Sequence, residues 1–297
     1  MPPASVIVPS VAGGERLARL LDSLAGQTAD QEVIVVDNAS PGGAVEHACD
    51  GRAGVEVIAM ERNAGFSRAV NVAAERAGGD ALVLVNDDCV CDPGFVGAIA
   101  AALDPAGGVA MAAGVMRDGR DRSLIDSAGM ELDRTLLVFD YLNGEPVSRL
   151  DRTVPDPVGP SGAAAAFDRA AFIESGGFDE RLFAYWEDVD LVLRLRREGA
   201  RCALAPEALG THEHSATLGS GSARKNYLMG FGRGYVMRKW SVLRSPSRAA
   251  RALATDAVVC AGQAVVDRNL GGVRGRIRGY RAARPSEPFP QGSATAR

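Results

Sequence analysis

The sequence predicts an α/β protein in which helices flank a mostly parallel central sheet. Short apolar runs alternate with helix-forming segments four times between residues 5 and 103. This alternation favours βαβ units joined by right-handed crossovers. The runs are apolar throughout, as is typical of strands with both faces covered. The chain has 297 residues, 46% of them hydrophobic, which suffices for one large domain or two small ones.

The first half of the chain predicts four strand–helix pairs in succession. The first strand is a β-branched run that ends at Pro9, and the leucines of the first helix recur at helical spacing. The strands are predicted at residues 5–9, 33–36, 55–58 and 81–85, and the helices at 13–25, 42–49, 66–76 and 93–103.

The second half is less regular. A strand is predicted at 109–116, and residues 117–160, rich in Asp, Arg and Pro, offer one strand candidate at 135–139. The later elements are a small apolar segment at 162–167, helices at 168–175 and 187–198, a strand at 201–205, and helices at 224–243 and 249–270. Residues 285–297 are rich in Pro, Ser and Gly, a composition typical of disorder.

Charge is distributed unevenly along the chain. Residues 1–223 hold 18 Lys and Arg against 34 Asp and Glu, a balance of −16, whereas residues 224–297 hold 15 against 3, a balance of +12. A basic segment on an acidic body indicates either an anionic partner, such as a membrane surface, or docking of the segment onto its own body. The sequence leaves both open. We expect three parts: a body at 1–223, a basic helical extension at 224–284 and a tail at 285–297.

Cysteine usage and hydropathy suggest where the protein resides. The five cysteines are few, odd in number and without a CxxC pair, which favours a reducing compartment and no disulfide framework. No signal peptide precedes residue 11, and no run of apolar residues is long enough to span a bilayer. We therefore expect a cytoplasmic protein, with peripheral contact at the inner face of the membrane left open by the basic extension.

A cluster of polar side chains follows the apolar run at 81–85. Asn86, Asp87 and Asp88 fall at the carboxyl end of that predicted strand, where ligands bind in open α/β sheets. Two adjacent carboxylates are costly to bury, and a hard cation such as Mg²⁺ would relieve that cost. The alternative is a solvated turn in which an aspartate caps a helix.

Several well-known nucleotide and hydrolase motifs are missing. The chain has neither a GxxxxGK[ST] phosphate loop nor a GxGxxG turn after its first strand, and no GxSxG elbow. These absences count against a nucleoside triphosphatase, a dinucleotide dehydrogenase and a serine hydrolase. What remains is a metal-assisted site for a nucleotide-like ligand, with a separate carboxylate available as base.

Several motifs follow one another along the chain: VVDNAS at 35–40, RNAGFSRAVN at 62–71, NDD at 86–88, GGFDERLF at 176–183 with WEDVDL at 186–191, and HEHSAT at 212–217. Any one segment is weakly specific, but their order is informative, and together they cover about residues 4–240. This order of motifs resembles glycosyltransferase family 2, specifically its rhamnosyltransferase-like members of the GT-A fold.

The resemblance implies a nucleotide-binding side of the site. Asp37 would accept a hydrogen bond from N3–H of uracil or thymine, although a turn-forming Asp-Asn is the plain alternative. Asn63 and Asn71 would line the nucleotide or cap the following helix. The residues carried over to the nucleotide are Pro9, Asp37, Asn38, Asn63, Gly65, Asn71, Asn86 and Asp87. The first strand departs from the family, because Pro9 is followed by Ser-Val-Ala-Gly rather than a Pro-Thr-Tyr-Asn type of turn.

The resemblance also implies a metal and a base. Asp88, with His212 or His214, would hold Mg²⁺ or Mn²⁺ at the donor diphosphate, and Asp188, beside Glu187, would deprotonate the acceptor hydroxyl. A single displacement would invert the anomeric centre. The alternative for residues 187–190 is an acidic helix start favoured by the macrodipole, with Asp190 paired to Arg194.

The expected function is therefore transfer of one sugar from a dTDP- or UDP-linked donor, such as rhamnose or another deoxysugar, to an acceptor hydroxyl. The acceptor classes left open are a glycan, a lipid-linked glycan and a small natural product, and a homodimer is also left open. No nucleic-acid partner is expected. The absence of a QxxRW motif favours single addition over polymerisation. A nucleotidyltransferase of related fold and an inactive nucleotide-sugar binding module are the competing functions.

Overall fold

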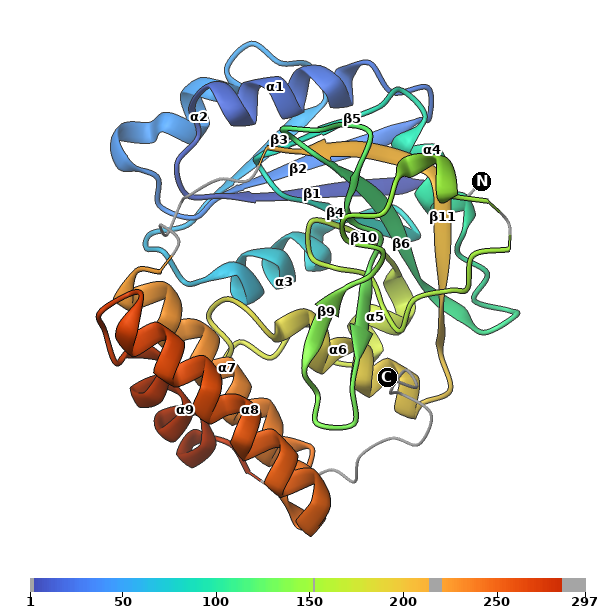
Figure 1. Cartoon of the computed structure of the whole chain (residues 1–297). Helices are drawn as coiled ribbons and strands as arrows, with labels where there is room; N and C mark the ends of the chain where they lie inside the picture. Colours follow the sequence, from blue (N-terminus) through green and yellow to red (C-terminus); the bar gives the residue numbers. More distant parts are fainter. Residues whose placement is uncertain (1–2, 152, 214–220, 285–297) are drawn as a thin grey trace.

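The computed structural model describes residues 3–151, 153–213 and 221–284. In these residues, nine strands form one mixed sheet of order β3-β2-β1-β4-β10-β6-β11-β5, with β7 paired to β6, and β8 and β9 form a separate hairpin. Figure 1 shows helices on both faces of the large sheet and a group of three helices at the C-terminal end of the chain.

The N-terminal half of the sheet is parallel, as predicted. Its strands are β1 (Ala4–Ser10), β2 (Gln31–Asp37), β3 (Val55–Ala59) and β4 (Ala81–Val85). In the register, Ser10 lies opposite Asp37, and Ile7 lies opposite both Ile34 and Leu84. The carboxyl ends of β1, β2 and β4 therefore meet at one edge of the sheet, where ligands bind in such folds.

Successive residues of these strands enter two different cores. Val6 and Val8 pack with the leucines of α1 and with α4, whereas Ile7 packs with α3 and α6 on the opposite face. Leu82 and Val83 divide in the same way, and all five residues of β4 are buried. This two-sided burial explains why the strands are apolar throughout.

The helices that cover the sheet lie close to their predicted ranges. Asp168 caps α5 as expected, with its carboxylate accepting from the backbone N–H of Ala171. These helices are α1 (Gly14–Ala25), α2 (Ala44–Cys49), α3 (Phe66–Arg76), α4 (Phe95–Ala101), α5 (Arg169–Glu174) and α6 (Glu187–Arg197). The short 3₁₀ helices are η1 (Pro41–Gly43), η2 (Val147–Arg149) and η3 (Val242–Arg244).

The second half of the sheet is less regular than the first. The strand β10 runs antiparallel to β4 and β6, so the sheet is mixed beyond β4, whereas β11 again runs parallel to β6. The predicted strand at 201–205 extends to His212 as β11, and the candidate at 135–139 is displaced to β9. The strands are β5 (Cys89–Cys91), β6 (Val109–Asp118), β7 (Ile125–Ser127), β8 (Met130–Leu132), β9 (Val138–Asp140), β10 (Ala164–Asp168) and β11 (Arg201–His212).

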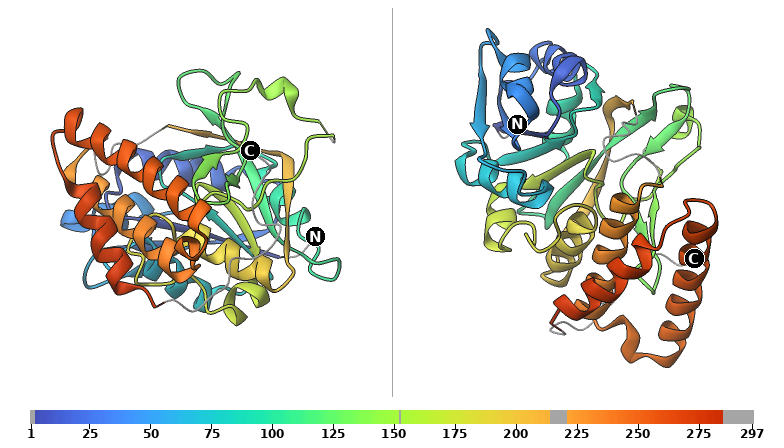
Figure 2. Two further views of the ribbon diagram at one scale, coloured as in Figure 1. Left: turned by 60° about the horizontal axis from the view of Figure 1, so that its bottom comes forward. Right: turned by 90° about the vertical axis from the view of Figure 1, so that its left-hand side faces the viewer.

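The basic segment forms α7 (Ala223–Lys239), α8 (Pro246–Val265) and α9 (Gly271–Ala282), the last of which the sequence analysis did not predict. They stand together at one side of the molecule (Figure 2). Glycines allow α7 and α9 to touch backbone to backbone: a Cβ on Gly275 would lie 2.1 Å from the carbonyl oxygen of Tyr227, and one on Gly279 would lie 1.9 Å from that of Phe231.

Two aspartates of the body, Asp190 buried and Asp179 half-buried, attach α7 to the body. Asp190 of α6 accepts hydrogen bonds from Trp240 Nε1 at 3.1 Å and Lys239 Nζ at 2.8 Å, besides the expected ion pair with Arg194 at 3.0 Å. Asp179 accepts from the Tyr235 hydroxyl at 2.7 Å and from Lys239. Docking of the basic segment on its own acidic body, one of the two expectations, therefore holds for α7.

None of the described helices is both long and apolar enough to cross a membrane. All five cysteines are free thiols, as their spacing predicted. Residues 285–297, expected to be disordered, lie outside the described residues.

Candidate active site

A cavity of about 910 Å³ lies at the carboxyl ends of the parallel strands. Its walls come from the ends of β1, β2 and β4, the start of α6, the hairpin strand β9, the end of β11, and helices α7, α8 and α9. Of the predicted site residues, Pro9, Asn38, Asn63, Gly65, Asn86, Asp87, Asp88, Glu187, Asp188 and His212 line it. The fold thus brings segments from Pro9 to Arg276 around one space.

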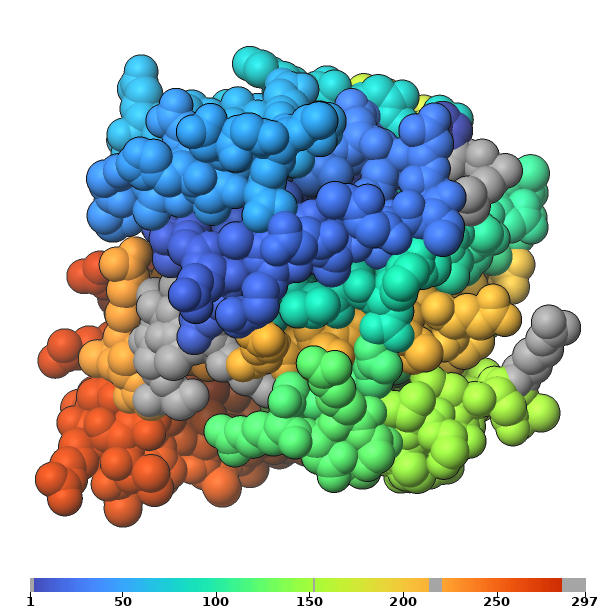
Figure 3. Space-filling view, turned by 90° about the horizontal axis from the view of Figure 1, so that it is seen from above, coloured from blue at the N-terminus to red at the C-terminus, as the bar shows by residue number. Residues whose placement is uncertain are grey.

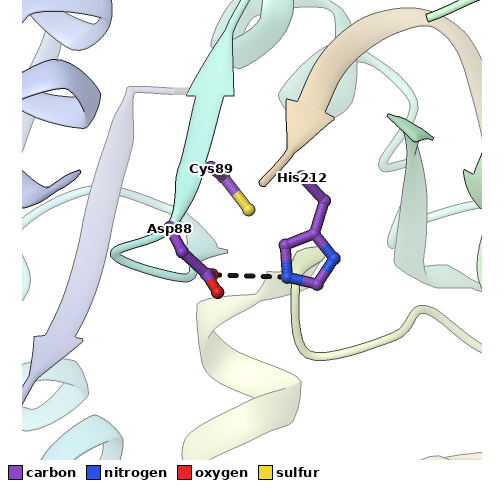
Figure 4. A group of neighbouring side chains, drawn as sticks. All are labelled: Asp88, Cys89 and His212. Carbon is purple, nitrogen blue, oxygen red and sulfur yellow. Dashed lines mark ion pairs between the residues drawn. The ribbon is translucent and has the colours of Figure 1, made fainter. Parts of the chain in front are cut away.

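Asp88 and His212 lie against each other in this cavity. His212 Nε2 is 3.3 Å from Asp88 Oδ1, and the Sγ of Cys89 completes a group whose ligand atoms all lie within 4.8 Å of one another (Figure 4). His212 reaches this point because β11 extends alongside β5, with His212 opposite Cys89 in the register. The other candidate, His214, lies outside the described residues.

Asp126 orients His212 from behind. The Nδ1 of His212 is 2.8 Å from Asp126 Oδ2, which leaves Nε2 directed at Asp88. Burial alone would lower the pKa of His212, but the hydrogen bonds to Asp126 and Asp88 outweigh it and raise that pKa to about 9. A carboxylate behind a histidine that ligates a metal is a recurrent arrangement, because it fixes the tautomer and the ring.

The residues of this group fit a hard divalent cation better than a soft one. Asp88 and His212 supply oxygen and nitrogen about as far apart as two neighbouring ligands of one ion. Cys89 is a poor third ligand for such an ion, because burial raises the pKa of its thiol well above the usual value. The Sγ of Cys89 lies 3.8 Å from the Ala163 carbonyl oxygen, a contact typical of a protonated thiol packed in the interior.

Asp87 lies beside Asp88 and is tied to the end of β1. Burial raises the pKa of Asp87, and the charge of Asp88 adds to that effect, whereas a hydrogen bond from the Ser10 hydroxyl opposes it. Ser10 follows Pro9, at the turn where the sequence departs from the family pattern. Its hydroxyl donates a hydrogen bond to the Asp87 carboxylate. Two neighbouring buried carboxylates favour a bound cation.

The loop at 62–65 is held against β2 by side-chain amides. Asn38 donates to the Gly65 carbonyl at 3.1 Å and accepts from the Ala64 N–H at 2.9 Å, and Asn63 accepts from the Gly65 N–H at 3.0 Å. Gly65 has φ +92°, and a Cβ there would lie 2.3 Å from the Phe183 carbonyl oxygen. Only glycine therefore lets this loop approach the segment that precedes α6.

Asp37 and Asn71 occupy other positions. Asp37 is 8% exposed and is not among the residues that line the cavity; its carboxylate accepts from the backbone N–H and hydroxyl of Ser40. Asn71 lies on α3 and clamps Phe178, accepting from its N–H at 2.8 Å and donating to its carbonyl at 2.9 Å. The contacts of Asn71 join the second motif of the sequence to the GGFDE segment.

Asp188 and Glu187 begin α6 and line the same cavity as Asp88. The Val189 N–H donates to Asp188 Oδ1 at 2.8 Å, yet burial outweighs this and raises the pKa of Asp188. Burial, with the charge of Asp188 in addition, raises the pKa of Glu187 well above its usual value. The Oε2 of Glu187 is buried without a hydrogen-bond partner among the described residues. These carboxylates are therefore poised to take or share a proton.

Asp126 and Asp140 are two acidic residues of the body that lie near the cavity and that sequence reasoning missed. Asp126 contacts His212, and Asp140, at the end of β9, lines the cavity. Both come from the irregular region at 117–160, where no motif marks them. Only their positions in the fold identify them, because no local sequence pattern does.

A family model and a curated relative both match the chain. The family model described as "Glycosyl transferase family 2" matches residues 5–175. The chain is 30% identical over 239 residues to the "N-acetylglucosaminyl-diphospho-decaprenol L-rhamnosyltransferase" of Mycobacterium tuberculosis strain H37Rv, which covers 72% of this chain and 77% of that protein.

Solved structures share the fold at lower identity. "GalNAc-T7 with UDP, GalNAc and Mn2+" superposes with a TM-score of 0.66 at 17% identity, over 95% of this chain and 55% of that one. "Mannosyltransferase PcManGT from Pyrobaculum calidifontis in complex with GDP-Man and Mn2+" superposes with a TM-score of 0.57 at 18% identity, over 94% and 84%. These likenesses confirm the GT-A fold that the sequence predicted.

Proposed function

Since this chain belongs to glycosyl transferase family 2, we propose that it moves one sugar from a nucleoside diphosphate donor to an acceptor hydroxyl with inversion. The observation that carries the proposal is that Asp88, His212 and Asp188 line one cavity. The body of the protein supplies the acidic groups of this cavity, which are needed to hold a cation and to remove a proton. Family membership favours glycosyl over nucleotidyl transfer.

The donor side lies along β1, β2 and β4. Asp88 and His212 would hold Mg²⁺ or Mn²⁺, with Asp87 beside them, and a bound cation supplies positive charge that stabilises the departing diphosphate. Asn38, Asn63 and Gly65 shape the wall near the nucleotide. The backbone of this wall is fixed by hydrogen bonds within the protein, so it is organised before the donor binds.

Asp188 acts on the acceptor. The acceptor oxygen attacks the anomeric carbon, the bond from that carbon to the diphosphate oxygen breaks, and the hydroxyl proton passes to the Asp188 carboxylate. Burial raises the pKa of Asp188, which makes it a stronger base than an exposed aspartate. Burial and the charge of Asp188 raise the pKa of Glu187 well above its usual value, which favours the protonated form of Glu187 and so reduces the repulsion between the two carboxyl groups.

The relative's name suggests the donor and acceptor classes. The mycobacterial protein is described as a rhamnosyltransferase that acts on N-acetylglucosaminyl-diphospho-decaprenol. We extend this to a dTDP- or UDP-linked deoxysugar and a lipid-linked glycan acceptor for the present chain.

A donor panel tests the reaction. Transfer and hydrolysis of UDP-, dTDP- and GDP-sugars are measured with and without Mn²⁺, and the product anomer is assigned by NMR. We expect turnover with one nucleotide class, loss of turnover in EDTA and an inverted product. A retained anomeric configuration, or full rate in EDTA, would contradict the mechanism.

The variant Asp188→Asn tests the base. Its kcat is expected to fall by about 10²- to 10⁴-fold, the usual contribution of a general base. The wild-type rate should fall as pH decreases through the raised pKa of Asp188, so the acid limb lies closer to neutrality than an ordinary aspartate would place it. The residual rate of the variant should be independent of pH over that limb. An Asp188→Asn enzyme with wild-type kcat would refute the role.

A further inference from the structure

The C-terminal helices give the cavity a cationic wall. Every Arg and Lys among its described lining residues comes from α7 or α9, namely Arg224, Lys225, Arg233 and Arg276. The lining carboxylates of the body are Asp87, Asp88, Asp140, Glu187 and Asp188, and the helices contribute only Asp256. The cavity is thus acidic toward the sheet and basic toward the helices.

Arg233 is the most buried member of this cationic wall. Its side chain is 1% exposed; Nη1 donates to the Thr135 carbonyl at 2.7 Å and Nε lies 3.2 Å from Asp256 Oδ1. Its Nη2 is buried and has no hydrogen-bond partner among the described residues. Leaving a guanidinium N–H unsatisfied is costly, and an anionic oxygen in the cavity would satisfy it.

The positive charge of this wall exceeds what Asp256 can neutralise. Asp256 Oδ1 faces Arg276 Nη2 at 3.3 Å as well as Arg233, so two guanidinium groups share one carboxylate. The Nε of Arg276 is also buried without a partner. Lys225 lies over the ring of Tyr185, 6.0 Å from its centroid, at the same wall. A surplus of fixed cations with unused donors is the chemistry of a phosphate site.

Through Arg233, this wall adjoins the segment that carries the proposed base. The Arg233 guanidinium lies over the ring of Trp186, 5.6 Å from its centroid, and Trp186 directly precedes Glu187 and Asp188. A Cβ on Gly232 would lie 2.4 Å from Trp186 Cδ1, so α7 fits tightly against this ring. A phosphate bound here would therefore belong to the acceptor.

Apolar side chains border the same wall. Met229 of α7 and Val259 of α8 both line the cavity, and each is 38% exposed. The exposed apolar surface continues along α8 through Val258. A phosphate group with an aliphatic chain attached would satisfy both the cations and these side chains.

We propose that Lys225, Arg233 and Arg276 form an acceptor subsite that binds the phosphate or diphosphate joining a sugar to a lipid. The proposal rests on the function proposed above and assigns the acceptor's charged linkage to the C-terminal helices. Arg233 and Arg276 donate to the phosphate oxygens, Lys225 adds charge at the rim, and the lipid leaves past Met229 and Val259.

Kinetics with paired acceptors test the subsite. Two water-soluble acceptors are compared, a short-chain alkyl N-acetylglucosaminide and the matching alkyl diphospho-N-acetylglucosamine. The wild type should show the lower KM for the diphospho compound. Lys225→Gln and Arg276→Gln should raise that KM about tenfold or more, and leave the KM of the donor and of the neutral acceptor unchanged. Arg278→Gln, on the same helix but outside the cavity lining, is the matched control.

Arg233 is left intact in this test, because its removal would strand Asp256 in a buried position and could unfold the helices. A wild type that does not distinguish the two acceptors, or variants that raise both acceptor KM values equally, would overturn the subsite while leaving the transferase function standing.

Binding of inorganic pyrophosphate in EDTA gives a measurement independent of turnover. Calorimetry should detect binding to the wild type and to Asp88→Asn, and weaker binding to Lys225→Gln and Arg276→Gln. Binding that is lost in Asp88→Asn but retained in both cation variants would assign the anion to the donor side and overturn the proposal. Variant-sensitive binding in a protein that transfers no sugar would support the subsite and count against the proposed reaction.

Discussion

Asp126 illustrates how a residue outside every motif can control the site. It lies in β7, a strand of three residues, and its carboxylate holds His212 Nδ1 at 2.8 Å while Nε2 faces Asp88. Without this partner the imidazole can rotate or change tautomer, and its Nε2 is no longer held toward the cation.

Replacing Asp126 should therefore weaken metal binding without touching a metal ligand. Asp126→Ala is expected to lower the affinity for Mn²⁺ about 10- to 100-fold, as loss of such a supporting carboxylate typically does. Asp126→Asn keeps an oxygen that can accept from Nδ1–H and should lose less. Titration calorimetry with Mn²⁺ measures both. Equal affinity in Asp126→Ala and wild type would mean that His212 is not a ligand.

At the residue scale, sequence reasoning located those cavity-lining residues that border regular strands and helices. Asp88 could be predicted because it ends an apolar run, and Asp188 because it opens an amphipathic helix within a recognisable motif. Asp126 could not, because its strand is too short to carry a period. Asn71 shows the opposite case. Its motif is recognisable in the sequence, but its side-chain amide hydrogen-bonds to the backbone of Phe178 and does not line the cavity.

At the element scale, α9 is the longest element that the sequence did not predict. Its glycines lower intrinsic helix propensity, so the sequence GGVRGRIRGYRA resembles a loop. The spacing of Gly271, Gly275 and Gly279 places them on one face, where α7 approaches at backbone contact. Tertiary packing thus stabilises a helix that local propensity disfavours. The four-residue spacing of these glycines was the sequence feature that could have predicted this helix.

This contact predicts a sharp difference between two glycine-to-alanine changes. In Gly279→Ala the new methyl group meets the Phe231 carbonyl oxygen at 1.9 Å, whereas at Gly262 on α8 nothing lies within 4 Å. Both changes gain similar helix propensity, of about 1 kcal/mol. We expect Gly262→Ala to be neutral or stabilising, and Gly279→Ala to lower the free energy of unfolding by about 1–3 kcal/mol, as overpacking does.

Thermal unfolding and amide hydrogen exchange measure this difference. Loss of protection should be concentrated in α7 and α9 and leave β1 and β4 protected. If both alanine variants unfold at the same temperature, α9 does not pack on α7 as described.

At the scale of the whole molecule, the basic segment divides into a docked helix and exposed ones. Tyr235 and Trp240 of this segment are 1% and 0% exposed, because they pack on the body. The exposed apolar side chains lie instead on α8 and just beyond it, with Leu253, Val258, Val265 and Val266 between 56% and 79% exposed. The C-terminal helices form one corner of the molecule (Figure 3).

The basic segment as a whole is complementary in charge to an anionic lipid surface. Residues 224–284 carry 14 Lys and Arg against 2 Asp. Valine side chains entering the interface would add apolar burial to this attraction. We propose that α8 rests on the membrane and thereby presents the subsite at Arg276 to a lipid-linked acceptor.

Vesicle sedimentation tests this orientation with one double variant and one control. The double variant Val258→Asp with Val265→Asp should reduce binding to phosphatidylglycerol vesicles at least about tenfold. In this variant two carboxylates replace two apolar side chains that would enter a negatively charged membrane surface. Ile173→Asp, on α5 of the body where the side chain is 42% exposed, adds a charge elsewhere and should bind as the wild type does. Binding should weaken with added salt, since the attraction is partly electrostatic. Unchanged vesicle binding in the double variant, accompanied by a shift from dimer to monomer in light scattering, would instead make α8 a contact between two copies of the chain.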